Sequence, residues 1–109
     1  MRLKIKELTI GSFKYLVQYK RGLKNGNEKV WGICEHEKKQ VRLESTMGED
    51  FHWQVMFHEL RHATLWEQAK YRKYINEEFV DSDGNAWLQF LTNNPDFLEA
   101  LLEYTKKKK

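Results

Sequence analysis

A chain of 109 residues is near the commonest size of a single domain, which leaves room for one hydrophobic core and excludes a second. Hydrophobic residues make up 40% of the chain and charged residues 32%, a balance that favours a folded protein over a disordered one. The formal net charge of +3 depends partly on the lysine run at 106–109, so the body carries no broad basic field and nucleic-acid binding is not indicated.

Cysteine content and hydropathy narrow the class of protein further. Cys34 is the only cysteine, so the chain can form neither an internal disulfide nor a cluster of thiolate zinc ligands. No apolar run approaches the roughly 20 residues that span a bilayer, and the charged N-terminal residues do not resemble a signal peptide. We therefore expect a cytoplasmic protein without membrane contacts, and the sequence leaves its oligomeric state open.

Residues 1–44 alternate between apolar and polar side chains, which is typical of half-buried β-strands. The strongest turn signal of the chain lies at 21–27, where glycine and asparagine are concentrated. The pattern predicts a small antiparallel sheet, in which the last strand forms an exposed edge suited to pairing with an extended peptide. Its four strands are predicted at 3–10, 13–19, 30–34 and 40–43.

The hydrophobic period changes after Ser45, where Thr46 and Glu49 have the spacing of a capping box at a helix N-terminus. This first helix is predicted to end at about Trp66 or Gln68. The residue before a proline is pushed out of helical geometry, so a second helix over 77–92 should end before Asn94. Proline suits the first turn of a helix, and a third helix is therefore predicted from Pro95 to Tyr104.

The predicted first helix carries His58-Glu59-Leu60-Arg61-His62, the HExxH signature of zinc proteases. Residues four apart share a helix face, so His58 and His62 can present two imidazoles to one zinc ion. Glu59 lies beside them, where its carboxylate can act as the general base for a metal-activated water. The alternative is a helix with two ordinary histidines, but the strands before it and the acidic helix after it favour the metal site.

A catalytic zinc usually takes three protein ligands, and no histidine follows His62. Glu67 is on the first helix but is predicted to point away from the histidine face. The third ligand should therefore be a carboxylate of the second helix, where the candidates are Glu77, Glu78, Asp81 and Asp83.

Helical periodicity favours Glu77, because it shares a predicted core-facing side with Leu88 and a buried carboxylate needs a partner. Glu78 is the alternative, and Asp81 is placed to hydrogen-bond a ligating histidine. His36 and His52 lack ligand spacing and are expected at the surface. The oxyanion of the reaction could be stabilised by His52, Tyr71 or Tyr74, which the sequence does not rank.

Five segments between residues 30 and 96 together resemble small phage-encoded zinc metallopeptidases, minimal relatives of the ImmA/IrrE group. The resemblance implies zinc at His58, His62 and a glutamate of the second helix, with Glu59 as the base. It also implies a peptide or protein substrate, with a regulator as one candidate, and a host cytoplasm if a phage encodes the chain. The segments are Trp31-Gly32-Ile33-Cys34, Gln40-Val41-Arg42-Leu43, Met56 to Ala63, Glu77 to Asp81 and Gln89 to Pro95.

Pattern and resemblance together predict an α+β fold: a small antiparallel sheet in the N-terminal half, the HExxH metal helix and two further helices. We expect one minimal zincin-like domain at residues 1–105 and a disordered lysine tail at 106–109. The predicted function is a zinc-dependent metallopeptidase in which a metal-activated water hydrolyses a peptide bond, with Glu59 as the general base. The alternative is a non-catalytic, zinc-stabilised protein that sequesters a host or phage regulator.

Overall fold

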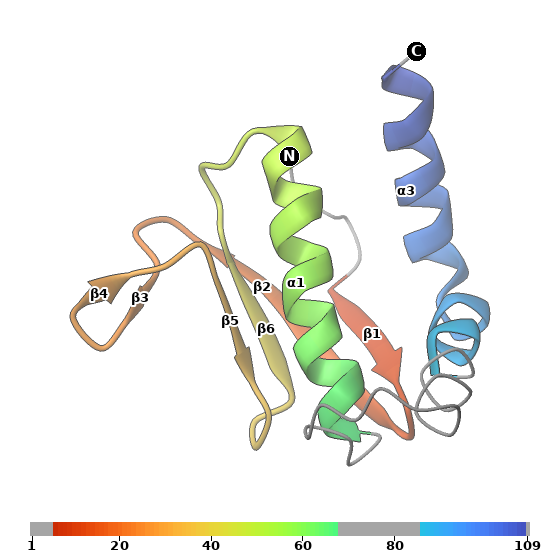
Figure 1. The fold of residues 1–109 in the computed structure, drawn as a ribbon, viewed down its shortest axis with the longest axis horizontal. Coiled ribbons are helices and arrows are strands. Elements are labelled where there is room, and N and C mark those ends of the chain that lie inside the picture. The colour runs from red at the N-terminus through yellow and green to blue at the C-terminus, as the bar shows by residue number, and fades with distance from the viewer. Residues whose placement is uncertain (1–5, 68–85, 109) are drawn as a thin grey trace, which may run out of the picture.

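A computed structural model describes residues 6–67 and 86–108 and has an α+β architecture, with a small sheet followed by helices (Figure 1). Residues 86–93 are also helical and precede the last helix. The elements with defined bounds are β1 (Glu7–Ile10), β2 (Phe13–Lys20), β3 (Lys24–Asn25), β4 (Glu28–Lys29), β5 (Gly32–Glu35), β6 (Gln40–Glu44), α1 (Glu49–Glu67) and α3 (Pro95–Lys107).

The main sheet has four strands in the order β1-β2-β6-β5 and is mixed, so the prediction of a purely antiparallel sheet was wrong. The outer pairs β1–β2 and β5–β6 are antiparallel, but the central pair β2–β6 is parallel, with Val17 opposite Val41. The turn signal at 21–27 does not join β2 to its neighbour in this sheet. It belongs to a separate two-stranded ribbon, β3–β4, in which Gly26 adopts a left-handed φ of 65°.

Because β6 enters the sheet between β2 and β5, it is a central strand and not the exposed edge that we predicted. Among the described residues, the edge strands of this sheet are β1 and β5. Helix α1 crosses one face of the sheet and packs closest to β5 (Figure 1). The two elements run in the same direction, since Trp31 meets Phe51 near their beginnings and His36 meets Trp66 near their ends.

Helix α1 begins at Glu49, and the predicted capping box between Thr46 and Glu49 does not form. The hydroxyl of Thr46 donates instead to the carboxylate of Glu44 at 3.0 Å, which lies at the end of β6. The first turn is closed by the backbone, because the amide of His52 donates to the carbonyl of Gly48 at 2.9 Å. Glu44 thus competes successfully for the hydroxyl on which the capping box depended.

The hydrophobic core lies between the sheet, α1 and the C-terminal helices. Strands contribute alternate residues such as Leu8, Ile10 and Tyr15, as a half-buried sheet requires. Helix α1 contributes the face that carries Met56, Leu60 and Ala63, all fully buried, and aromatic rings fill the space towards α3. The aromatic members are Trp53, Phe90 and Phe97, with Phe57, Trp87 and Tyr104 packed around them.

Asn94 joins the C-terminal helices to strand β1. Its carboxamide accepts the amide of Thr9 at 2.9 Å and donates to the carbonyls of Thr9 at 2.9 Å and Phe90 at 2.7 Å. Residues 86–93 form a helix that stops at Asn94, as the following proline predicted.

Helix α3 continues beyond the expected end at Tyr104, through Lys106 to Lys107. Lys106 and Lys107 thus belong to α3, where we expected a disordered tail over 106–109, and Lys109 lies outside the described residues. Lys107 pairs with Glu49 at 3.7 Å and Lys108 pairs with Asp50 at 3.4 Å, so two lysines lie against the acidic first turn of α1. No helix within 6–67 and 86–108 combines the length and apolar character needed to cross a membrane.

Candidate metal centre

The HExxH segment lies in the middle of α1, and its three functional side chains divide between two directions. His58 and His62 are exposed, whereas Glu59 is only 7% exposed and faces strand β5. Leu60 and Ala63 are fully buried on sides of the helix that point away from the two histidines, and they fix its rotation against the sheet. The two imidazoles are therefore accessible while the carboxylate is held between helix and strand.

The imidazoles of His58 and His62 converge. Their Nε2 atoms lie 3.2 Å apart, and the ring centroids are 4.8 Å apart with the planes nearly perpendicular. Two nitrogens bound tetrahedrally to one zinc ion at about 2.0–2.1 Å are separated by roughly 3.3 Å. The pair thus fits the separation that two histidine ligands of a zinc ion require.

The environment of Glu59 is suited to proton transfer. Burial raises the pKa of its carboxyl group above the usual value, and the positive charges of His58 and His62 oppose that shift. A carboxylate with these opposed influences can accept a proton more readily than an exposed glutamate at neutral pH.

Gly32 on β5 forms the wall opposite Glu59. A β-carbon at position 32 would lie 2.9 Å from Cγ of Glu59, 3.0 Å from its Oε2 atom and 2.9 Å from Cγ1 of Val55. A side chain at this position is therefore incompatible with the observed approach of β5 to α1. The sequence contained a signal for this contact, since a glycine within a strand often marks a close approach of the backbone.

The third zinc ligand predicted at Glu77, with Glu78 as the alternative, lies outside the described residues, as do Asp81 and Asp83. Within 6–67 and 86–108, no three His, Cys, Asp or Glu side chains are grouped closely enough to hold a metal ion. The described residues thus supply two converging imidazoles, and the set of ligands remains a prediction.

Glu67 is engaged elsewhere, in agreement with its predicted orientation away from the histidine face. Its carboxylate accepts a hydrogen bond from the hydroxyl of Tyr15 at 2.5 Å and pairs with the ammonium group of Lys39.

Cys34 lies on β5, where burial, followed by the negative charges of Glu59 and Glu67, raises the pKa of its thiol to about 12. The thiol of Cys34 is therefore protonated at neutral pH in the metal-free protein.

The other two histidines were both predicted at the surface, and neither is freely exposed. His36 is half-buried, and its ring stacks on Trp66 with centroids 4.3 Å apart and planes 6° apart. Burial, followed by the positive charge of His62, lowers the pKa of His36, which places it near the HExxH helix face.

His52 is fully buried, and its Nε2 atom lies 2.7 Å from the hydroxyl of Tyr19. Burial lowers the pKa of His52 to about 4, so the ring is neutral at physiological pH. A buried, neutral ring in the core cannot reach an oxyanion at the HExxH face, which removes His52 from the candidates. The other two candidates, Tyr71 and Tyr74, lie outside the described residues.

No family model, no curated protein and no solved structure matches this chain. The case for a function therefore depends on the geometry of the chain's own residues. Three features carry it: the paired imidazoles of His58 and His62, the buried carboxylate of Glu59, and the edge strand β5 that passes beside that carboxylate at Gly32.

Proposed function

We propose that this protein is a zinc-dependent metallopeptidase with a minimal zincin-like arrangement of edge strand and HExxH helix. The observation that carries the proposal is the 3.2 Å separation of the Nε2 atoms of His58 and His62, beside the partly desolvated carboxylate of Glu59. The same separation meets the geometry of a hydrogen bond between the two imidazoles, so metal analysis distinguishes a bound zinc ion from a shared proton.

His58, His62 and one glutamate of the second helix, Glu77 or Glu78, are the residues that would hold zinc. When bound, zinc supplies a Lewis acid that polarises the scissile carbonyl and lowers the pKa of a water molecule. The carboxylate of Glu59 accepts a proton from that water and then delivers it to the nitrogen of the leaving amine. Strand β5 shields one side of the Glu59 carboxylate at Gly32.

The free edge of β5 is suited to binding an extended peptide. Within the described part of the chain, β6 is the only strand paired with β5, so the outer edge retains backbone groups for another strand. A peptide added there would form main-chain hydrogen bonds and pass close to Glu59, because Gly32 belongs to the same strand. This assignment replaces the 40–43 strand that we first predicted for the role.

Metal analysis and a cleavage assay on unfolded casein test the proposal together. Wild-type protein should bind about one zinc per chain, and His58→Ala or His62→Ala should lose most of it. Glu59→Gln should keep zinc and fold but lose hydrolysis, because an amide cannot accept the proton. Glu37→Gln, which alters an exposed glutamate, is the matched control and should retain both properties.

The result also separates the peptidase from its main alternative. Zinc binding without hydrolysis of any peptide, equal in wild type and Glu59→Gln, would indicate a zinc-stabilised protein that sequesters a regulator. Full zinc stoichiometry in both histidine variants would show that the HExxH helix does not hold the metal.

A further inference from the structure

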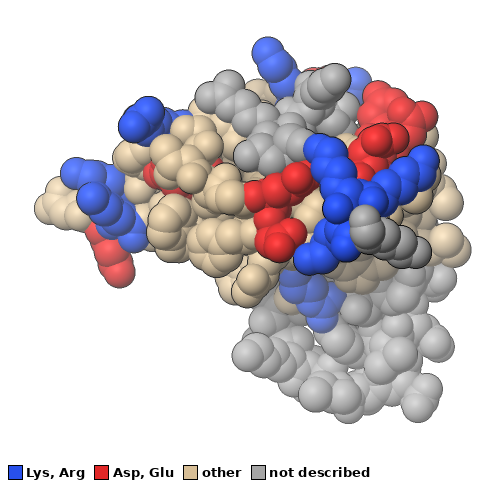
Figure 2. All heavy atoms as spheres, turned by 90° about the horizontal axis from the view of Figure 1, so that it is seen from above, with Lys and Arg blue, Asp and Glu red and all other residues tan. Residues whose placement is uncertain are grey.

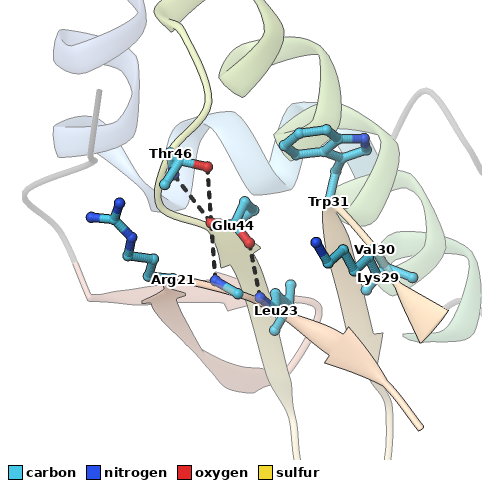
Figure 3. Close-up of a pocket in the computed structure, with 8 residues that line it drawn as sticks. Arg21, Leu23, Lys29, Val30, Trp31, Glu44 and Thr46 are labelled. Atoms are coloured by element: carbon cyan, nitrogen blue, oxygen red, sulfur yellow. Dashed lines mark hydrogen bonds between the residues drawn. The ribbon is translucent and has the colours of Figure 1, made fainter. Parts of the chain in front are cut away.

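A cavity of about 350 Å³ lies where the β3–β4 ribbon joins the start of β5 (Figure 3). Its walls are apolar at Leu23, Val30 and Trp31 and charged at Arg21, Lys29 and Glu44. A space of this size accommodates one or two amino-acid side chains of a bound peptide.

The negative charge of Glu44 is already satisfied by the protein. Its carboxylate accepts the amides of Leu23 at 2.8 Å and Gly22 at 3.3 Å, and both the amide and the hydroxyl of Thr46, at 3.4 and 3.0 Å. These hydrogen bonds, drawn in Figure 3, lower the pKa of Glu44 and direct its lone pairs towards the backbone. Glu44 therefore shapes the floor of the cavity and makes no ion pair with Arg21 or Lys29.

The basic side chains around the cavity remain available to a ligand. Residues 20–31 contain four basic residues and one acidic residue, a net charge of +3. Among the described residues, none of the four basic side chains forms an ion pair. Figure 2 shows Lys and Arg side chains gathered at the end of the molecule that this ribbon forms. The four basic residues are Lys20, Arg21, Lys24 and Lys29.

Trp31 lines the cavity and is the neighbour in the chain of Gly32, which contacts the candidate general base. The carbonyl of Trp31 accepts the amide of Glu44 at 2.9 Å, which anchors the start of β5. Its ring is 52% exposed and meets Phe51 edge to face, with centroids 5.3 Å apart. Phe51 and Glu59 are two helical turns apart on the side of α1 that faces β5, so an apolar surface leads from the cavity to the carboxylate.

We propose that this cavity is a specificity subsite that accepts an acidic side chain of the substrate peptide near Arg21 and Lys29, with an adjacent apolar residue on Trp31. The inference rests on the proposed peptidase function and adds a substrate class to it.

Charge complementarity decides in favour of an acidic peptide over a neutral one. Two unpaired cations in an open cavity attract a carboxylate and repel an ammonium group, and the apolar wall favours a neighbouring aromatic or aliphatic side chain. A basic residue in the same place would face like charges, so discrimination between Glu and Lys should exceed that between Glu and Gln.

The test uses synthetic eight-residue peptides with Glu, Gln or Lys at each of the three positions on either side of a central leucine. Cleavage by wild type is measured as kcat/KM, and binding to Glu59→Gln is measured as Kd, which does not require hydrolysis. At one position, Glu should be preferred over Lys by roughly tenfold in both measurements. Lys29→Glu should remove or reverse that preference.

Lys24→Glu is the matched control, because Lys24 is the cross-strand partner of Lys29 but does not line the cavity. It changes the net charge equally and should leave the preference for Glu in place. An equal loss in both variants would mean that the general charge of the ribbon, and not the cavity, selects the peptide, and would overturn the proposal.

The outcomes distinguish this inference from the proposed function. Equal cleavage of the Glu, Gln and Lys peptides overturns the subsite and leaves the peptidase intact. Selective binding of Glu peptides without cleavage overturns the peptidase and supports the subsite as a binding site for acidic peptides. Displacement of the peptide by micromolar inorganic phosphate would show a phosphate site instead and overturn the inference.

Discussion

Gly32 of β5 lies against Glu59 of α1 with no room for a side chain between them. A β-carbon on Gly32 would lie 2.9 Å from Cγ of Glu59, closer than β-carbons approach such atoms in folded proteins, and 3.0 Å from Oε2, which is tighter than most such contacts. The distance between the edge strand and the candidate general base therefore depends on a missing methyl group. That dependence links the packing of the fold directly to the chemistry proposed for it.

Gly32→Ala should displace the Glu59 carboxylate and lower peptidase activity by tenfold or more, while zinc binding by His58 and His62 persists. The added carbon would also lie 2.9 Å from Cγ1 of Val55. Because a β-branched side chain has few rotamers and cannot easily move away, the variant should also lose about 1–3 kcal/mol of unfolding free energy. Activity, zinc content and urea unfolding measured on one preparation separate these effects.

Gly48→Ala is the control for this substitution, because a β-carbon at position 48 meets nothing within 4 Å and its φ is not left-handed. Its activity should stay within about twofold of wild type, since no contact of Glu59 changes. If Gly32→Ala behaved in the same way, the strand would be free to move aside and the close approach would have no catalytic role.

The third zinc ligand is the next prediction, and it concerns residues that the structure does not describe. The preference for Glu77 assumed that it shares a core-facing side with Leu88, but Leu88 is 61% exposed, so that assumption was wrong and helical phase does not rank Glu77 above Glu78. Whichever of the two holds zinc, its replacement by Gln should weaken zinc affinity by a factor of roughly 10 or more, and the other replacement should be nearly neutral. Zinc titration of the two variants by competition with a chelator ranks them, and equal affinity in both variants would mean that neither glutamate is the third ligand.

Helical periodicity in the sequence was sufficient to predict how α1 faces the rest of the molecule. His58 and His62 are exposed and converge, whereas Leu60 and Ala63 are fully buried, as residues on opposite sides of an amphipathic helix should be. The same periodicity contained a signal that we missed. His52 precedes Met56 and Leu60 by four and eight positions and therefore lies on the apolar face, so its burial was predictable.

Strand pairing was less predictable, for a physical reason. Alternating hydrophobicity shows that a strand is half-buried but does not identify the strand beside it. No local sequence pattern therefore indicates that Val17 pairs with Val41 in a parallel arrangement. The turn signal at 21–27 suggested a simple hairpin, but it forms the β3–β4 ribbon and carries the chain across to the far edge of the sheet. The cavity beside Trp31 depends on this crossing and was equally inaccessible to sequence analysis.

Asn94 provides a stability prediction that is independent of the metal. Its carboxamide makes three hydrogen bonds to backbone groups of Thr9 and Phe90 while only 8% exposed. Asn94→Ala leaves the amide of Thr9 and two carbonyls without these partners, which should cost about 2–3 kcal/mol of unfolding free energy. Asn93→Ala, at the exposed neighbouring position, should change it by less than about 0.5 kcal/mol.

Urea unfolding of the two variants at pH 7.5 measures the difference. Zinc content should be unchanged in both, because neither residue belongs to the proposed ligand set. A loss in Asn94→Ala no larger than in Asn93→Ala would show that strand β1 and the C-terminal helices are held together by apolar contacts alone.

The last prediction concerns the dependence of stability on pH through His52. Burial lowers the pKa of this ring to about 4 in the folded protein, whereas an unfolded chain has the ordinary value of 6.5. Above pH 6.5 the ring is neutral in both states, and the full contribution to stability is present. As the pH falls from 6.5 towards 4, His52 becomes protonated in the unfolded chain but stays neutral in the folded protein. The free energy of unfolding therefore falls by roughly 3 kcal/mol at most.

His52→Phe removes this titration while keeping an aromatic ring against Tyr19, whose hydroxyl loses its hydrogen bond to the imidazole. The variant should be less stable than wild type at pH 7.5, but its unfolding free energy should fall less steeply between pH 6.5 and 4. Tyr19→Phe is the companion variant: it removes the same hydrogen bond but leaves the titrating ring, so its pH dependence should stay close to that of wild type. Parallel pH profiles for wild type and His52→Phe would mean that the folded protein tolerates a charged ring at position 52, and that the core opens to admit water around it.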